Sequence, residues 1–180
     1  MKSVNDLYEE QKSRTRHYLF KALFECLEQV SYSELSISRL CSAAEISRKT
    51  FYTHYGSIDE MVESWFDSRK KEYLLKVEDR TLEQYRPDLI AEEFFDFWSC
   101  RRTELLILYQ AGYPLNRIFM NTASEIIQIR SHQKADILKA WSAGAFYTLL
   151  LDWLSLKQEQ DIQNYPAKVI QSFQRNQIAE

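Results

Sequence analysis

The twelve residues from Ile46 to Ser57, ISRKTFYTHYGS, gather side chains that can bind a polyanion. They include two cations, Arg48 and Lys49, one histidine, His54, and several hydroxyl groups, but no acid. In protein–DNA complexes, cations, hydroxyls and imidazoles bind phosphates, and long side chains near a helix start can reach base edges. The segment therefore has the composition of a DNA-contacting helix.

Two short helices are expected to position these groups. The first begins after Ser36, a good N-cap, and its apolar residues are spaced by three, four and seven positions. Glu45 and Ile46 form a tight connection, and Ser47 caps a second helix that continues to about Tyr55. Two short helices joined in this way predict a helix-turn-helix.

The second helix has three faces. Phe51 and Tyr55 are four residues apart and are expected to face inward with Ile46. The remaining side chains form an outward set, in which Arg48, Lys49 and Tyr52 share one face and Thr50 and His54 lie beside it. A solvated cationic face without a ligand is the alternative interpretation of such a helix taken alone.

The whole chain is expected to be all-α. It has only three glycines and three prolines in 180 residues, and its apolar periodicity is helical almost throughout. We expect about nine helices, near residues 5–29, 37–44, 47–55, 58–79, 88–100, 103–111, 115–130, 134–157 and 167–176. Residues 1–58 would form the helix-turn-helix domain, with a linking helix over 58–79 and a second domain over 80–180.

Composition excludes several classes of function. The net charge is -3, and positive charge is concentrated near the N-terminus, where residues 11–24 carry four cations and no acid. No apolar run is long enough to span a membrane, and the acidic N-terminus is unlike a signal peptide, so we expect a cytoplasmic protein. The three histidines are far apart, and no HExxH motif or phosphate-binding glycine loop is present. We therefore expect no enzyme activity, no metal site and no cofactor.

The segment LSISRLCSAAEISRKTFYTHYGSIDEMVESWF resembles the DNA-binding region of the TetR/AcrR family of bacterial transcriptional regulators. The resemblance covers about residues 15–66, and its most specific run is Ile46, Ser47, Thr50, Phe51, Tyr52, His54 and Tyr55. It implies that Thr50, Tyr52 and His54 bind DNA phosphates. It also implies that Ser47, Arg48 and Lys49 approach bases and that Ser38 or Arg39 contributes at the preceding helix.

Two positions depart from the family pattern. The family often has glycine in the turn, where this chain has Glu45, which places an acid near DNA. If the turn requires a positive φ, a residue with a Cβ at this position also costs about 1 kcal/mol of stability. The family also often has a phosphate-binding lysine at the position of Ile58. We therefore expect the salt dependence of binding to be shallower by about one counterion for each half-site.

The C-terminal region is rich in aromatic residues. The resemblance implies a pocket there for a small hydrophobic or aromatic effector, with the candidate residues Phe94, Trp98, Tyr109, Tyr113, Phe119, Trp141 and Tyr147. The alternative is that these rings simply fill a core, which is the commoner role of aromatic residues at helical spacing.

The resemblance also favours a homodimer in which the helix over 134–157 and the last helix form a four-helix interface. The candidate interface residues are Leu138, Ala145, Leu149, Trp153, Ile170 and Phe173. Intramolecular packing is the alternative use of the small residues in this region. Two-fold symmetry would place two recognition helices about 34–36 Å apart, which matches a palindromic double-stranded DNA operator.

These expectations combine into a sequence-specific transcriptional regulator, a homodimeric repressor that a small-molecule effector releases from DNA. The alternative is an adaptor or coactivator that keeps this fold and acts mainly through a protein partner. Glu45 and Ile58 motivate that alternative, since both weaken the expected DNA contacts.

Overall fold

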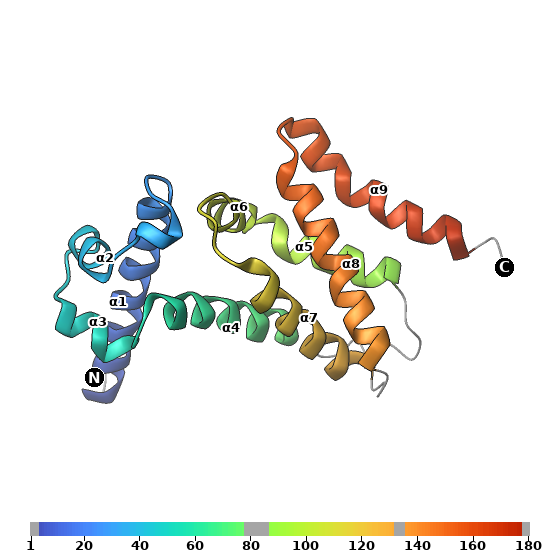
Figure 1. Cartoon of the computed structure of the whole chain (residues 1–180). Helices are drawn as coiled ribbons and strands as arrows, with labels where there is room; N and C mark the ends of the chain where they lie inside the picture. Colours follow the sequence, from blue (N-terminus) through green and yellow to red (C-terminus); the bar gives the residue numbers. More distant parts are fainter. Residues whose placement is uncertain (1–3, 78–86, 132–135, 178–180) are drawn as a thin grey trace. The chain divides into compact units, whose positions relative to one another are not determined.

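The computed structural model describes residues 4–77, 87–131 and 136–177, and in these ranges all regular structure is helical (Figure 1). The helices are α1 (Val4–Leu27), the 3-10 helix η1 (Tyr32–Glu34), α2 (Ile37–Ala43), α3 (Arg48–His54), α4 (Ile58–Val77), α5 (Pro87–Ser99), α6 (Arg102–Gln110), α7 (Leu115–Ser131), α8 (Asp136–Ser155) and α9 (Glu159–Gln177). The expected all-α class with about nine helices is confirmed. Among these described helices, none is long and apolar enough to cross a lipid bilayer.

The chain forms two compact units. The N-terminal unit comprises Met1–Trp65 together with Leu106–Tyr113, and the C-terminal unit comprises Phe66–Leu105 together with Pro114–Glu180. The N-terminal unit thus contains more than the helix-turn-helix region expected over residues 1–58. It also includes the start of α4 and the end of α6.

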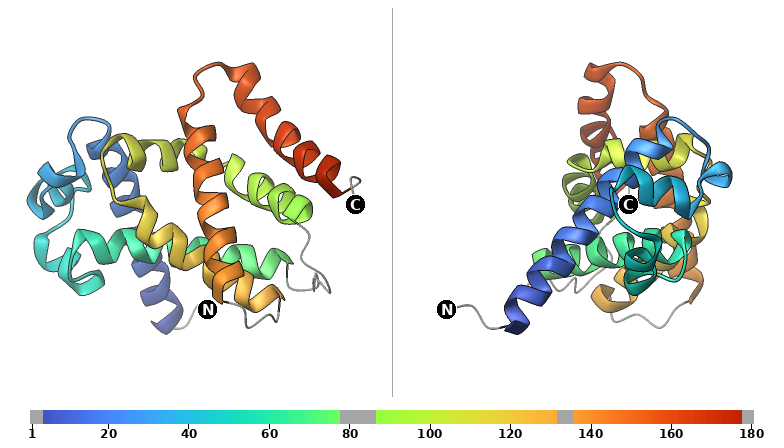
Figure 2. Two further views of the ribbon diagram at one scale, coloured as in Figure 1. Left: turned by 45° about the vertical axis from the view of Figure 1, so that its right-hand side comes forward. Right: turned by 90° about the vertical axis from the view of Figure 1, so that its left-hand side faces the viewer.

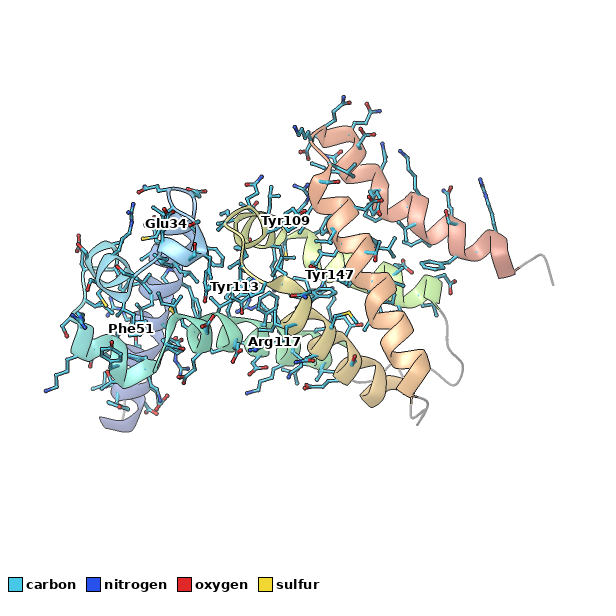
Figure 3. The ribbon with its side chains drawn as sticks, viewed as in Figure 1. Glu34, Phe51, Tyr109, Tyr113, Arg117 and Tyr147 are labelled. Atoms are coloured by element: carbon cyan, nitrogen blue, oxygen red, sulfur yellow. The ribbon has the colours of Figure 1, made fainter. Side chains whose placement is uncertain are left out.

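The core of the N-terminal unit is built from one face of each of its helices. Its fully buried side chains include Leu19 and Leu23 of α1, Leu40 of α2, Phe51 of α3 and Met61 of α4. The rings of Phe51 and Tyr55 lie 6.0 Å apart, and Tyr55 lies 6.2 Å from Phe20 of α1. Figure 3 labels Phe51 on its short helix. This packing fixes the orientation of α3 relative to α1.

Tyr32 of η1 joins the segment Leu106–Tyr113 to the rest of the N-terminal unit. Its backbone N–H donates to the carbonyl of Ala111 at 2.8 Å, and its ring meets Tyr113 edge-on at 4.8 Å. Its hydroxyl donates to the Asp59 carboxylate at the start of α4 at 2.6 Å. Burial and the adjacent Asp59 charge raise the pKa of Tyr32, so the phenol stays protonated as a donor.

The C-terminal unit is held together by helix pairs, in which α7 packs on α8 and α5 packs on α9 (Figure 2). Gly144 of α8 faces α7, where a Cβ at this position would lie 4.0 Å from the Met120 side chain. Ala143 beside it is fully buried. Gly144 and Ala143 therefore pack within the chain.

Helix α9 begins earlier than the sequence predicts. The sequence predicts the last helix only near 167–176, beyond Pro166, but α9 starts at Glu159 and contains Pro166 in its interior. A proline cannot donate to the carbonyl four residues earlier, which here belongs to Ile162. The indole Nε1–H of Trp153 donates to that carbonyl instead, at 3.2 Å. This substitute donor allows the helix to continue through the proline.

Arg102 at the start of α6 caps the C-terminal end of α8. Its Nη2 donates to the carbonyls of Trp153, Leu154 and Leu156 at 2.9, 3.2 and 3.0 Å. Its guanidinium lies 5.5 Å from the centre of the Trp153 ring. Helix carbonyls at a C-terminus lack partners within the helix, so a cation in this position satisfies them and complements the helix dipole.

Candidate nucleic-acid interface

Serine caps start both helices of the helix-turn-helix, as predicted. The Ser36 hydroxyl accepts from the Arg39 backbone N–H at 3.2 Å at the start of α2. The Ser47 hydroxyl accepts from the Thr50 N–H at 3.0 Å and lies 2.8 Å from the Thr50 hydroxyl. Ser47 thereby defines where α3 begins and holds the Thr50 side chain at that end.

The turn between α2 and α3 is a Schellman motif with an unusual residue at its left-handed position. The Glu45 N–H donates to the Ser42 carbonyl at 3.2 Å, and the Ile46 N–H donates to the Cys41 carbonyl at 3.0 Å. Glu45 has a φ of 54°, the left-handed region that favours glycine. The end of α6 has the same motif with Gly112 in this position, at a φ of 80°. The turn therefore does require a positive φ.

Replacement of Glu45 by glycine is expected to raise the free energy of unfolding by about 1 kcal/mol, because glycine adopts this φ without a Cβ clash. Urea denaturation of the purified protein measures the change. Glu45→Ala is the matched control, since it removes the charge but keeps the Cβ. An equal gain in Glu45→Ala would show that charge, and not backbone strain, limits stability at this turn.

The outward face of α3 presents the predicted contact residues to solvent. Arg48 and Lys49 are exposed, the side chain of Tyr52 is 50% exposed, and Thr50 is half-buried. Thr53, which was not among the predicted contact residues, is exposed on this helix as well. The inward face is closed by Phe51, which has no exposed surface. The helix thus separates a core face from a face of cations and hydroxyls.

The two candidates on α2 are placed differently. Ser38 is exposed. Arg39 is exposed too, but its Nη2 donates to the Gln29 side chain at 3.2 Å, in the segment that follows α1. The hydrogen bond therefore directs Arg39 toward the end of α1, and its contact with DNA stays a prediction.

His54 lies at the end of α3 and is half-buried. Its Nδ1 atom is shielded from solvent and has no hydrogen-bond partner among the described residues. Burial lowers the pKa of His54, and the positive charges of Arg16 and Lys12 on α1 lower that pKa further. The sequence predicts positive charge on the first helix but not its proximity to His54. The four-residue spacing of Lys12, Arg16 and Phe20 was the available signal.

The start of α4 supplies its own acceptors. The Glu60 N–H donates to the Ser57 hydroxyl at 3.0 Å, and the Gly56 N–H donates to the Glu60 carboxylate at 2.7 Å. Ile58 is half-buried at the first helical position. A DNA phosphate at this helix start would face the carboxylate of Glu60. The loss of one contact with the DNA backbone at Ile58 stays a prediction.

The candidate pocket residues fall into both units. In the C-terminal unit, Phe94 lies 5.8 Å from Phe119, and Phe119 lies 6.3 Å from Trp98 and 5.9 Å from Tyr147. Figure 3 labels Tyr147 on α8. These four rings therefore form one contiguous aromatic cluster.

The remaining pocket candidates do not join that cluster. Tyr113 belongs to the N-terminal unit and is buried against Tyr32. Tyr109 belongs to the same unit, and its side chain is 42% exposed. The side chain of Trp141 lies outside the described residues.

The candidate interface residues differ in exposure. Ala145, Leu149, Ile170 and Phe173 are each half-buried in the protomer. Trp153 is only 2% exposed and packs on Phe95, so the structure places it in the core and not on the surface. The side chain of Leu138 lies outside the described residues.

Within the part of the chain that is described, no group of acidic, histidine and cysteine side chains could hold a metal ion.

Comparisons with known proteins agree with this geometry. Residues 19–64 match the family model described as bacterial regulatory proteins, tetR family. Among solved structures, the chain is similar to the dihydroxyacetone kinase operon activator DhaS, with a TM-score of 0.53 and 15% identity over 92% of this chain and 94% of that chain. No curated protein matches the sequence. The matched segment contains all of α2 and α3, so this N-terminal region is a helix-turn-helix domain of the tetR type.

Proposed function

We propose that the protein is a homodimeric, sequence-specific transcriptional repressor that a small-molecule effector releases from its operator. The observation that carries this proposal is the outward face of α3, where Arg48, Lys49 and Tyr52 are exposed on a helix anchored by buried Phe51. A rigid helix with such a face can enter a major groove with its long side chains toward the bases.

The proposed contacts divide into two kinds. Arg48 and Lys49 stand in the first turn of α3 and would reach base edges, together with Ser47. Tyr52 and Thr50 would donate hydroxyl hydrogen bonds to phosphates and thereby set the register of the helix on the duplex. The Thr50 hydroxyl is already held by Ser47, so it would meet DNA in a fixed orientation.

The half-buried side chains of Ala145, Leu149, Ile170 and Phe173 support a dimer through α8 and α9. They leave apolar surface on one protomer that a second copy would cover. In a two-fold dimer the two α3 helices would reach successive major grooves of a palindrome, about 34–36 Å apart.

An effector would act by favouring one distance between the two helix-turn-helix domains of the dimer. Only a ligand with different affinities for the two arrangements can shift their populations. The aromatic cluster of Phe94, Trp98, Phe119 and Tyr147 is the proposed region for a hydrophobic or aromatic effector. Its rings contact one another, so an effector must displace or extend these contacts.

Fluorescence anisotropy with the DNA upstream of the protein's own gene tests the proposal. We expect specific binding below micromolar protein, with an affinity that falls steeply as the salt concentration rises. A scrambled duplex of the same length is the control. Equal affinity for both duplexes, or no salt-sensitive binding at micromolar protein, would contradict a DNA-binding repressor.

Two substitutions on α3 should separate the two kinds of contact. Tyr52→Phe removes a phosphate donor and is expected to weaken binding to every operator variant by a similar factor, about fivefold to tenfold. Arg48→Ala is expected to cost about 1–3 kcal/mol on the best operator and to relax the preference at one base pair. Anisotropy against a panel of single-base operator variants measures both. A changed base preference in Tyr52→Phe would contradict these roles.

An activator or adaptor that works mainly through a protein partner is the second candidate. Glu45 is exposed in the turn directly before α3, and Asp59 and Glu60 lie in the first turn of α4, so acids border the DNA-contacting face. The structurally similar DhaS is named an operon activator. A transcriptional reporter in a deletion strain distinguishes the candidates, because loss of a repressor raises transcription and loss of an activator lowers it.

A further inference from the structure

A hollow of about 540 Å³ lies between α1 and the turn that joins α2 to α3. Its apolar lining consists of Tyr18, Ala22, Ala43, Ala44 and Ile46. Three of these five residues are alanines, whose short side chains leave the space open. The Tyr18 side chain is 51% exposed beside it. The N-terminal unit therefore has an open, partly apolar hollow that can receive a side chain of another molecule.

A second hollow, of about 380 Å³, continues the first one between α1 and α2, which pack side by side (Figure 1). Glu25 and Ala43 line both hollows, and the second extends to Gln29, just beyond the end of α1. We call the two hollows together the α1–α2 groove. From Tyr18 to Gln29 it follows about three helical turns, or about 16 Å, which is long enough to receive a helical segment of a partner.

The first hollow has a net negative rim. Lys21 and Glu25 are exposed and pair with each other at 3.7 Å. Glu45 is exposed as well, but it forms no ion pair within the described ranges. Arg39 lies at the other end of the groove, where it donates to the Gln29 side chain. The first hollow therefore complements a segment that presents an apolar side chain next to a cation.

The groove lies beside the DNA-contacting helix but contains none of its residues. Glu45 and Ile46 directly precede Ser47, the N-cap of α3, whereas no residue of α3 lines the groove. Two residues span at most about 7 Å, so an occupant at Glu45 lies next to the DNA that α3 would contact. The carboxylates of Glu25 and Glu45 repel phosphates, which disfavours DNA itself as the occupant. A protein held on neighbouring DNA fits better, because such proteins have strongly positive surfaces there.

We propose that the α1–α2 groove docks RNA polymerase while the protein is bound at its operator. An apolar side chain of the polymerase would enter the first hollow, and an adjacent lysine or arginine would pair with Glu45. RNA polymerase is the protein that must bind DNA beside any operator in a promoter. The proposal rests on DNA binding by α3, and it gives the second candidate function, activation, a docking surface. It also gives a role to the strained backbone of Glu45, since such strain clusters at functional sites.

A contact between two proteins on the same DNA makes their binding cooperative. Coupling between two binding sites is typically about fivefold to 150-fold, and it acts equally on both partners. We therefore expect the operator Kd to fall about tenfold when polymerase occupies the promoter. By the same linkage, the affinity of the polymerase for the promoter should rise by an equal factor.

DNase I footprinting on the promoter upstream of the protein's own gene, with and without RNA polymerase holoenzyme from the source bacterium, tests the groove. Ala43→Phe fills the first hollow from an exposed position at the end of α2. Glu25→Lys reverses a rim charge and would repel a basic segment. Each variant should bind the operator alone with the wild-type Kd but lose most of the tenfold gain. Circular dichroism confirms that both variants are folded.

Glu28→Lys is the matched control, because Glu28 is an exposed acid three residues after Glu25 that does not line the groove. It should keep the full gain, and its loss there too would overturn the groove in favour of a general charge effect. A wild-type Kd that polymerase raises or leaves unchanged, or an undiminished gain in both groove variants, would overturn the groove and leave DNA binding intact.

Self-association is a further outcome that would overturn this occupant. Mass photometry without polymerase would then show additional copies of the protein on the promoter fragment, and Ala43→Phe would remove them. No operator binding by the wild-type protein at any concentration of polymerase would overturn both the groove and the DNA binding on which it rests.

Discussion

Phe51→Ala is expected to lower the free energy of unfolding of the N-terminal unit by about 4 kcal/mol and to abolish operator binding. The phenylalanine side chain has no exposed surface and contacts Tyr55, so its removal leaves a cavity under α3. A helix of seven residues has little stability of its own, and packing of this face holds it in place. Loss of the packing should release the whole DNA-contacting face.

Tyr52→Ala is the matched control for this substitution. It removes an aromatic ring from the next position of the same helix, but one that is 50% exposed. We expect it to weaken operator binding with a change in unfolding free energy below about 1 kcal/mol. Urea denaturation and anisotropy on both variants separate folding from recognition. A Phe51→Ala protein with wild-type stability would contradict the placement of Phe51 in the core.

Trp153→Phe is expected to destabilise the C-terminal unit by about 3 kcal/mol. The indole N–H is the observed donor to the Ile162 carbonyl, which Pro166 cannot satisfy, and its loss leaves a partly buried acceptor unpaired. The smaller ring also loses contacts in the core, where Trp153 is 2% exposed and contacts the ring of Phe95 and the guanidinium of Arg102. Denaturant unfolding monitored by circular dichroism measures the change in the free energy of unfolding.

A double-mutant cycle with Pro166→Ala isolates the hydrogen bond. Alanine at 166 restores a backbone N–H that can donate to the Ile162 carbonyl within α9. In that background Trp153→Phe should cost about 1–2 kcal/mol less, because the carbonyl has regained a partner. Equal costs in both backgrounds would show that the effect of Trp153 comes from packing alone.

The local elements of the DNA-binding region could be predicted from the sequence because their signals are local. Ser36 and Ser47 do cap α2 and α3, and the spacing of Phe51 and Tyr55 does bury both side chains. A cap depends on residues three positions apart, and a helical face depends on residues four apart. The positive φ of Glu45 could be anticipated only from the family pattern, since nothing in a glutamate indicates it.

Features that depend on distant partners could not be predicted. The continuation of α9 through Pro166 requires Trp153, which lies on another helix. The placement of Tyr113 beside Tyr32 requires contact between residues far apart in the sequence, so the aromatic pattern alone assigned Tyr113 to the C-terminal region. The effect of Arg16 and Lys12 on the pKa of His54 likewise depends on the packing of α1 beside α3. Periodicity defines faces of helices but not which faces meet.

The contacts of Tyr32 with Ala111 and Tyr113 have a consequence for biosynthesis and for chimeric regulators. During translation, the N-terminal unit cannot be completed until residue 113 has left the ribosome, although α1 to α3 are made much earlier. A chimera that exchanges only residues 1–65 would pair Tyr32 with a foreign segment in place of its own. Grafts that transfer residues 106–113 together with the first 65 would keep both contacts of Tyr32 native.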